Sequence, residues 1–380
     1  MNMTEILQKK GTRDLTRRID LDWLRVFVIL MLIPFHAAVM FDLGDDFFVR
    51  NGVHSIALAN FTDSIGAWGM QLLFFVAGAS SWFMLRKYDW KNFINRRVFR
   101  LFIPLIAAIV TFMPLMGYYA YRYHGGAALS FLQYYPKFFS IDAKDYSGYL
   151  GHLTPGHLWF ILFLLVLLLL ALPIFNWLKR DRGQQVANRI ITFLGKPGAL
   201  FIVPVIMLLF DGVPEVADRN VVSFFILLIF GFIWMSDSRL QEQIDRQKYA
   251  WLTLAIVLGI LWTMLQAWGD QQIGFSAGTI VFDLLHDIYI LAAILALLGI
   301  GHCFLNRPSR AIQYLGPASY PIYIIHLPIV MAIGYYVTQW DMAVWLKYAI
   351  ITLISFPVVF AVYDVLMRRV PFIGRFFGAK

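Results

Sequence analysis

The chain has 380 residues, of which 60% are hydrophobic and only 14% are charged, and its mean hydropathy is +0.67. Because an ordinary soluble domain carries roughly 25% charged residues, this composition excludes a soluble globular enzyme. The aromatic content of 17% excludes a disordered chain, and a single cysteine, Cys303, excludes an intramolecular disulfide scaffold. In a soluble protein a net charge of +9 would suggest an anionic partner. In a membrane protein it can instead reflect which side of the membrane the loops face, so the positions of the charged residues decide between the two.

Apolar runs of about 20 residues, the length that crosses a bilayer core about 30 Å thick, follow one another along the chain. The fifth run is the weakest, because it is short, follows Gly-Lys-Pro-Gly and contains Pro204. We expect an all-α polytopic membrane protein with one domain over residues 1–380. The ten predicted transmembrane helices cover residues 22–42, 64–85, 101–121, 157–178, 198–211, 220–236, 250–268, 281–304, 319–338 and 345–367.

The basic residues are distributed as the positive-inside rule requires. With the N-terminus in the cytoplasm, all but six of the 32 Lys and Arg residues fall on the cytoplasmic side. Omitting the fifth helix would invert every later loop, so we keep ten helices and place both tails, 1–21 and 369–380, in the cytoplasm. No short apolar core precedes a small-x-small cleavage site, so we expect the first helix to be retained. The six outer basic residues are Arg50, Arg122, Lys137, Lys144, Arg219 and Lys347.

The two longest predicted outer loops, about 42–63 and 122–156, are too short for a separate domain. They are rich in aromatic, glycine and acidic residues, a composition that suits a sugar-binding surface but is also ordinary for a loop. The residues concerned are Asp42, Asp45, Asp46, Tyr134, Tyr135, Asp142 and Asp145.

The first predicted helix carries an ionisable stripe. A charged side chain at the centre of a span costs at least about 2.5 to 3.5 kcal/mol, so each one is a candidate functional residue. His36 follows Arg25 by eleven positions, which places the two within about 20° on one helical face and roughly 16 Å apart along the axis. Asp22 lies one turn before Arg25 and can pair with it, and Pro34 can kink the helix just before His36. An anchoring arginine and a satisfied interior histidine would give the same pattern.

A second basic group, Arg96, Arg97 and Arg100, marks the cytoplasmic start of the third helix. Two guanidinium groups on one helical face can hold a phosphate or pyrophosphate bidentately, as a nucleotide-bearing donor such as coenzyme A requires. Anchoring to lipid phosphates is the simpler alternative. No Walker loop or Rossmann glycine fingerprint occurs, so the sequence does not support an NTPase or a dinucleotide enzyme.

Two further polar groups lie at membrane depth. His157 and Trp159 stand where the chain re-enters the membrane from outside, and this pair can bind a substrate hydroxyl and stack on a sugar, or belong to the interfacial aromatic belt. Tyr320, Tyr323 and His326 in the ninth predicted helix fan over about 120° of one face. A polar stripe of this kind has to face protein or water, so we count Tyr323 and His326 as candidate substrate-binding residues.

Asp283, His286 and Asp287 form an i, i+3, i+4 group near the outer end of the eighth predicted helix. This spacing resembles a metal or acid/base group. No further convincing ligand is evident and the group lies where solvation is cheap, so we do not expect a metal.

In order along the chain, these signatures resemble the acyltransferase 3 family of integral membrane acyltransferases, and the resemblance covers nearly the whole chain. Three departures or gaps accompany it: Ala77 and Ala79 flank Gly78 where the family often has Ser-Gly-Phe or Ser-Gly-Tyr, the outer loops match least, and no motif separates an acetyl from a succinyl donor. The matching residues are Asp22-Trp23-Leu24-Arg25 with His36, Phe74-Phe75-Val76-Ala77-Gly78, Arg97-Val98-Phe99-Arg100, His157-Leu158-Trp159-Phe160 and Tyr320 to His326.

The resemblance implies a multi-pass protein of the bacterial inner membrane that transfers an acyl group from cytoplasmic acyl-CoA to a carbohydrate hydroxyl on the outer side. It also implies that His36 is the catalytic histidine, Arg25 its essential partner, and Arg97 and Arg100 donor-binding residues. Acyl-CoA would be a substrate, with no permanently bound cofactor and no nucleic-acid partner.

The expected mechanism has neutral His36 take the proton of the sugar hydroxyl and return it to the departing thiolate. An acyl-histidine intermediate is the alternative. His326 or Tyr323 are candidates for stabilising the oxyanion, on polarity alone. A carrier that moves a glycan or lipid-linked sugar without reacting with it would also explain the polar stripe, although no internal pseudo-symmetry is evident. A structural scaffold within a glucan-export complex is a third alternative.

Overall fold

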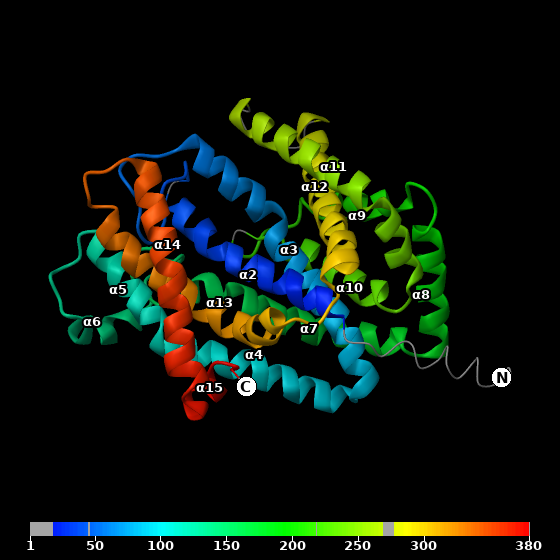
Figure 1. Ribbon diagram of the computed structural model, residues 1–380, viewed down its shortest axis with the longest axis horizontal. Helices are drawn as coiled ribbons and strands as arrows, with labels where there is room; N and C mark the ends of the chain where they lie inside the picture. Colours follow the sequence, from blue (N-terminus) through cyan, green and yellow to red (C-terminus); the bar gives the residue numbers. More distant parts are fainter. Residues whose placement is uncertain (1–17, 45, 218, 269–276, 380) are drawn as a thin grey trace.

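The computed structural model describes residues 18–44, 46–217, 219–268 and 277–379. Within these residues the secondary structure is helical throughout and contains no strand (Figure 1). Eight of the described helices are long and apolar enough to cross a membrane, so the expected all-α polytopic fold is confirmed.

The eight spans coincide with eight of the ten predicted apolar runs. Several are continued by a neighbouring short element, as when α4 runs into α5 and when π-helical turns extend α12 and α14. The elements of these spans are α2 (Ile19–Val39), α3 (Ile56–Lys87), α4 (Trp90–Thr111) with α5 (Met113–Tyr123), the 3-10 turn η2 (Gly156–Leu158) with α7 (Trp159–Leu178), α11 (Arg239–Trp268), α12 (Ala277–Ile300) with η4 (Gly301–Leu305), α13 (Arg310–Val337), and α14 (Val344–Val362) with η5 (Tyr363–Arg368).

The fifth and sixth predicted runs differ from simple crossings. The fifth forms η3 (Ala199–Phe201) and α9 (Ile202–Leu208), which meet α8 (Asp181–Leu194) at a bend of 115°. Gly198, whose φ of +75° favours glycine, lies at this bend. The sixth forms α10 (Val221–Trp234), and its 14 residues reach only about 21 Å. The described residues therefore contain eight full spans, or nine if the bent pair is one span.

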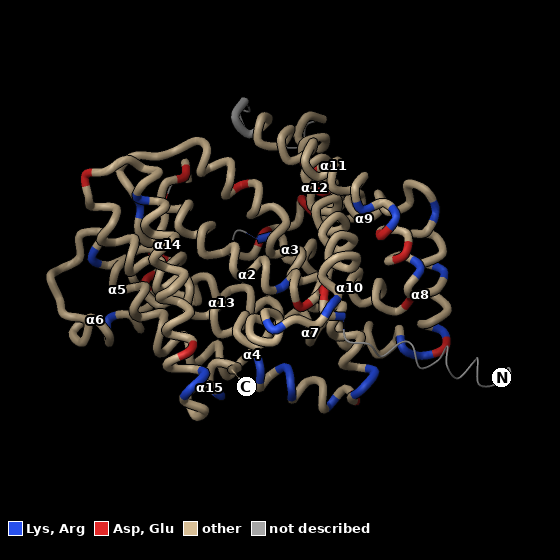
Figure 2. The backbone as a smooth tube through the Cα atoms, viewed as in Figure 1, with Lys and Arg blue, Asp and Glu red and all other residues tan. Residues whose placement is uncertain are grey.

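Figure 2 shows that Lys and Arg gather along the lower edge of the view, around the start of α4 and around α15 (Pro371–Phe376). Far fewer basic residues lie at the opposite end of the bundle. This distribution is the one that a positive-inside orientation requires. The placement of both termini in the cytoplasm stays a prediction, with the lower edge as the cytoplasmic side.

Helices α2 and α13 lie side by side inside the bundle, with α3, α5, α12 and α14 packed around them (Figure 1). Helix α13 is buried along most of its length although it contains Pro317, Pro321 and Pro328. Neighbouring helices cover the backbone groups that these prolines free, which makes such residues tolerable in a membrane helix. The polar stripes predicted on α2 and α13 are therefore brought to a shared interior.

Helices α3 and α10 meet at two glycines. A Cβ atom on Gly78 would lie 1.9 Å from the backbone oxygen of Leu228, and one on Gly231 would lie 2.1 Å from the backbone oxygen of Phe75. Only glycine permits this backbone contact, which is a common way for helices to associate in membranes.

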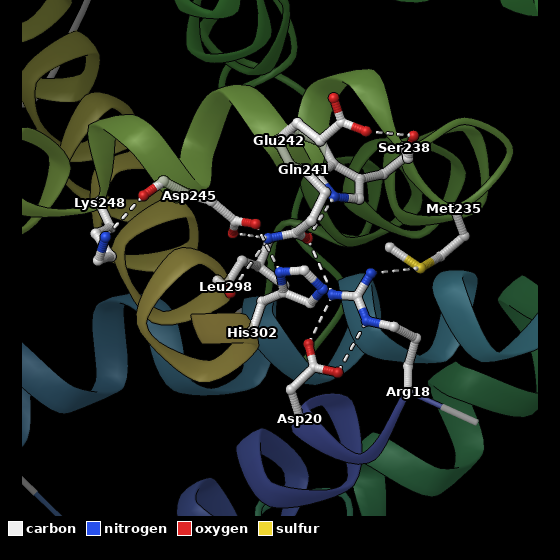
Figure 3. Close-up of polar contacts among 11 residues, drawn as sticks. Arg18, Asp20, Met235, Ser238, Gln241, Glu242, Asp245, Lys248, Leu298 and His302 are labelled. Atoms are coloured by element: carbon white, nitrogen blue, oxygen red, sulfur yellow. Dashed lines mark hydrogen bonds and ion pairs between the residues drawn. The ribbon is translucent and has the colours of Figure 1, made fainter. Parts of the chain in front are cut away.

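A polar network fixes the first turn of α2 to the rest of the bundle (Figure 3). The Arg18 guanidinium donates to both carboxylate oxygens of Asp20, at 2.8 and 2.6 Å, and to the Gln241 side-chain oxygen at 3.0 Å. The Gln241 amide donates to Asp245, which also contacts His302 Nδ1 at 2.7 Å. Asp20 is fully buried. The network joins α2 to α11 and η4, so it sets the position of the helix that carries Arg25 and His36.

Candidate active site

The stripe on α2 faces the interior of the bundle. Trp23, Phe27, Leu30 and Pro34 lie on one face of α2 and line an apolar cavity of about 410 Å³ with residues of α12, η4 and α14. At 100° per residue, Arg25 and His36 lie on roughly the opposite side of the helix. Their side chains therefore do not share the apolar face.

Arg25 has the partner that the sequence predicts. Its Nη2 atom lies 2.6 Å from Oδ1 of Asp22, and both side chains are partly buried. The pair holds the guanidinium near the predicted cytoplasmic end of the bundle rather than letting it extend freely toward the headgroups.

Two of the three arginines of α4 join Arg25. The guanidinium groups of Arg25, Arg97 and Arg100 lie close enough to one another to interact electrostatically. Arg97 Nη2 donates to Ser81 Oγ at 3.1 Å, whereas its buried Nε atom has no hydrogen-bond partner in the described part of the chain. Arg96 takes another direction, with its guanidinium 4.0 Å from the ring centre of Tyr88. The donor-binding group predicted from sequence is thus divided by the fold.

The three clustered guanidiniums, which we call the arginine cluster (Arg25, Arg97 and Arg100), carry more positive charge than Asp22 offsets. Asp22 acts on Arg100 as well as on Arg25. Like charges gathered in a region partly shielded from water repel one another, and a bound anion relieves that repulsion. The fork geometry of guanidinium suits a phosphate or pyrophosphate.

Helix α13 connects the arginine cluster with the interior. Tyr320 acts electrostatically with Arg100, and its buried hydroxyl has no hydrogen-bond partner among the residues that the structure describes. Tyr323 and His326 follow at successive three-residue steps, so the predicted face of α13 is polar from the arginine cluster to the middle of the bundle. The six steps from Tyr320 to His326 cover about 9 Å along the axis.

Three histidines meet at the inner end of this face, and we call them the histidine cluster (His36, His157 and His326). The ring centres of His36 and His326 are 5.2 Å apart, and those of His157 and His326 are 4.9 Å apart. His326 is fully buried and His157 is 6% exposed. Each ring has one buried nitrogen without a hydrogen-bond partner in the described chain: Nδ1 of His36, Nδ1 of His157 and Nε2 of His326.

Backbone contacts fix the proton positions of two of these rings. His157 Nε2 lies 3.1 Å from the backbone oxygens of both Tyr323 and Ile324, and His326 Nδ1 lies 2.6 Å from that of Tyr323. A carbonyl oxygen only accepts, so these nitrogens donate, and the unpartnered nitrogen of each neutral ring carries a lone pair.

This arrangement affects the oxyanion prediction. A lone pair on His326 Nε2 does not donate to an oxyanion, and the Tyr323 hydroxyl already donates to the backbone oxygen of His157. Neither residue has a free donor for the role that polarity alone had suggested.

The loop after α2 covers the histidine cluster from the predicted outer side. The Phe47 ring stacks on the His36 ring, with ring centres 6.2 Å apart. It also meets the Tyr149 ring edge to face, with ring centres 5.9 Å apart. The backbone N–H of Asn51 donates to Met40 at 2.8 Å, which ties the loop to the end of α2. Nothing in the sequence pattern had marked Phe47, because its role depends on how the loop folds back.

The remaining predicted loop residues largely serve the loops themselves. Asp42 pairs with Arg50 at 3.1 Å, and Asp145 contacts His152 at 2.8 Å. Tyr134 is buried and donates to a backbone oxygen, whereas Tyr135 is half-buried and donates to the backbone oxygen of Val110 at 2.9 Å. Asp142 is half-buried and Asp46 is exposed, and Asp45 lies outside the described residues. These pairings favour the ordinary-loop interpretation over a sugar-binding one.

Trp159 lies apart from the histidine cluster. It packs against Phe224 of α10 with ring centres 5.7 Å apart, and the Arg219 guanidinium lies 5.1 Å from its ring centre. His157 and Trp159, although only two residues apart, therefore face different neighbours.

The group at the predicted outer end of α12 has a partner that the sequence had not indicated. Asp287 is hydrogen-bonded to Asp211, which lies just after α9, and His286 stacks on Trp262 at 4.4 Å. Burial and the charge of Asp283 raise the pKa of Asp211 to about 6. Two carboxyl groups so close are favoured when one of them keeps its proton.

Comparisons with known proteins identify the family of this chain. Glucans biosynthesis protein C from Salmonella typhi and the same protein from Salmonella typhimurium LT2 are each 23% identical to this chain over 336 residues. The matched region covers 85% of this chain and 84% of each relative. No solved structure matches the chain. The acyltransferase domain family, Acyl_transf_3, matches residues 18–364, so the chain belongs to the acyltransferase 3 family of membrane acyltransferases.

Proposed function

We propose that this protein transfers an acyl group, succinyl or acetyl, from cytoplasmic acyl-CoA to a hydroxyl of a periplasmic glucan, from a position in the bacterial inner membrane. One observation carries the proposal: the polar face of α13 joins the arginine cluster to the histidine cluster across the interior of the bundle. The similarity to proteins of glucan biosynthesis favours a glucan as the acceptor.

The arginine cluster is the proposed donor site. Arg97 and Arg100 hold the phosphates of coenzyme A, and Arg25, paired with Asp22, completes the positive charge. The unpartnered Nε of Arg97 supplies a donor that bound phosphate would satisfy. Arg96 is left out of this site because it lies over Tyr88.

The donor has to bridge the distance to His36, roughly 16 Å along α2 from Arg25. The acyl-pantetheine arm would follow the face of Tyr320 and Tyr323 on α13, which offers polar groups at successive turns. This route brings the thioester to the histidine cluster while the nucleotide stays at the cytoplasmic end.

His36 is the proposed general base. It takes the proton from the glucan hydroxyl as the hydroxyl oxygen attacks the thioester carbon. The carbon–sulfur bond then breaks, and His36 returns the proton to the departing thiolate. The reaction needs no permanently bound cofactor, because acyl-CoA is consumed as a substrate.

The test uses purified protein reconstituted in vesicles with acyl-CoA and periplasmic glucan. The proposal predicts release of free CoA thiol that depends on glucan, together with a matching mass increase of the glucan that identifies the acyl group. A carrier would leave the thioester intact while glucan crosses the membrane, and that result would contradict the proposal.

A matched pair of variants tests the donor site. Arg97→Gln removes a guanidinium of the arginine cluster, so we expect the KM for acyl-CoA to rise by about tenfold or more, because a charge-assisted contact contributes about 1.5 to 3 kcal/mol. Arg96→Gln removes the same charge one residue away and should leave this KM close to that of the wild type. Equal effects of the two substitutions would show that total surface charge, not the cluster, attracts the donor.

A further inference from the structure

The histidine cluster contains a buried acceptor that the proposed reaction does not yet use. His326 is fully buried, its Nδ1 donates to the Tyr323 backbone oxygen at 2.6 Å, and its Nε2 lone pair has no hydrogen-bond partner within the described residues. Leaving a buried polar group unpaired costs about 1 to 3 kcal/mol. An unpaired acceptor of this kind is often found at a functional site, where another group donates a hydrogen bond to it during the reaction.

His36 is placed to be that partner. Its ring is tilted by 33° to the ring of His326, and their centres are 5.2 Å apart. At this separation, a His36 nitrogen that points toward His326 Nε2 would lie about 3 Å from it, which is hydrogen-bonding distance. The buried Nδ1 of His36 is itself without a hydrogen-bond partner in the described chain.

A neutral imidazole has one N–H and one lone pair, on opposite sides of the ring. If the N–H of His36 is donated to His326, the lone pair of His36 is directed away from His326. A base needs that lone pair to face the proton that it removes, so the orientation of the N–H decides whether His36 is active.

We propose that His326 is a positioning residue, which accepts the N–H of His36 and so selects the tautomer that leaves the other nitrogen free for the acceptor hydroxyl. The inference deepens the proposed function and rests on it. The hydroxyl proton passes to the free nitrogen of His36, the new oxygen–carbon bond forms, the carbon–sulfur bond breaks, and the same proton passes to the thiolate. His326 keeps its own proton on Nδ1 throughout, so its charge does not change.

The contacts around His326 hold it in this orientation before any substrate arrives. His157 Nε2 donates to the backbone oxygens of Tyr323 and Ile324 at 3.1 Å each. The Tyr323 hydroxyl donates back to the backbone oxygen of His157. The 3-10 turn η2 and the middle of α13 are thus held together one turn before His326. A ring whose Nδ1 is hydrogen-bonded, on a backbone that is itself held in place, needs little reorganisation to accept a hydrogen bond at Nε2.

Two substitutions of His326 test the proposal. His326→Gln places a side-chain oxygen near the position of the Nε2 lone pair, whereas His326→Leu removes every acceptor at similar size. We expect His326→Leu to lower kcat by about 10²-fold and His326→Gln to recover at least about tenfold of that loss. The KM for acyl-CoA should stay within about twofold of the wild-type value in both, because the arginine cluster is untouched. His326→Phe replaces His326→Leu if the latter does not insert into the membrane.

A double substitution separates action through His36 from independent structural damage. Because His326 acts only through His36, His36→Ala combined with His326→Leu should be no slower than His36→Ala alone. The inference is overturned if His326→Gln is as slow as His326→Leu, or if the double variant is about 10²-fold slower than His36→Ala. If His326→Leu is fully active while His36→Ala is inactive, this inference is overturned but the proposed function is not. Wild-type-like transfer by His36→Ala overturns the proposed function as well.

Discussion

The close contact between α3 and α10 predicts how one substitution changes both the stability of the fold and the binding of the donor. In Gly78→Ala, the new Cβ would lie 1.9 Å from the backbone oxygen of Leu228, whereas real Cβ contacts shorter than 3.0 Å essentially do not occur. The two backbones would have to separate by about 1.1 Å, and no flexible side chain can absorb that movement. Overpacking typically costs about 1 to 3 kcal/mol, and a backbone clash belongs at the upper end.

Gly69→Ala is the matched control on the same helix. Its Cβ would meet the Val28 side chain at 3.8 Å, which is an ordinary contact. Alanine is a better helix former than glycine by up to about 1 kcal/mol, so Gly69→Ala should be neutral or stabilising. Gly78→Ala should instead lower the free energy of unfolding by about 3 kcal/mol, measured by tryptophan fluorescence during denaturation in detergent micelles.

The same substitution should weaken donor binding. Ser81, which accepts a hydrogen bond from Arg97, lies one turn after Gly78 on α3. Movement of α3 therefore displaces a partner of the arginine cluster, and the KM for acyl-CoA should rise in Gly78→Ala but not in Gly69→Ala. If both variants unfold with the same free energy, the close approach of the two helices does not exist as described.

The remaining predictions concern charges. Asp20→Asn leaves Arg18 without its buried carboxylate and should lower the free energy of unfolding by about 3 to 5 kcal/mol. Asp22→Asn should lower it by about 1 kcal/mol or less, because its partner Arg25 is about one-third exposed. Denaturation in detergent micelles measures both values. The pKa of Asp211 is raised to about 6 from an ordinary value of 3.8, so the folded state binds this proton more tightly than the unfolded state. Its contribution is therefore complete below about pH 4 and is lost as the pH rises through about 6; the Tm of the wild type should fall across this interval more than that of Asp211→Asn. An equal pH dependence in both proteins would exclude Asp211 as the titrating group.

Apolar runs predict where this chain crosses the membrane because hydrocarbon leaves few alternatives to a helix. They do not predict where a helix ends, since the residues beyond the hydrocarbon are polar: the run 64–85 belongs to a helix that covers Ile56–Lys87. The bend of 115° between α8 and α9 was also beyond the pattern, although Gly-Lys-Pro-Gly had already marked the fifth run as weak.

Contacts within one helix were predictable, whereas contacts between helices were not. Helical periodicity places Asp22 beside Arg25 and aligns the polar residues of α13, and the structure shows both. The rotation of α4, which directs Arg97 to Ser81 and Arg96 elsewhere, depends on how neighbouring helices pack. The same packing brings together His36 and His326, 290 residues apart, a contact for which the sequence offers no local signal.

The most direct test of the account measures transfer from acyl-CoA to glucan by His36→Ala in a single turnover, after confirming that the variant is folded, inserted and saturated with acyl-CoA. The account predicts that acyl-CoA binds normally, because the arginine cluster is unchanged, and that transfer slows by about 10²- to 10⁴-fold. Transfer at the wild-type rate would contradict the assignment of His36 as the base.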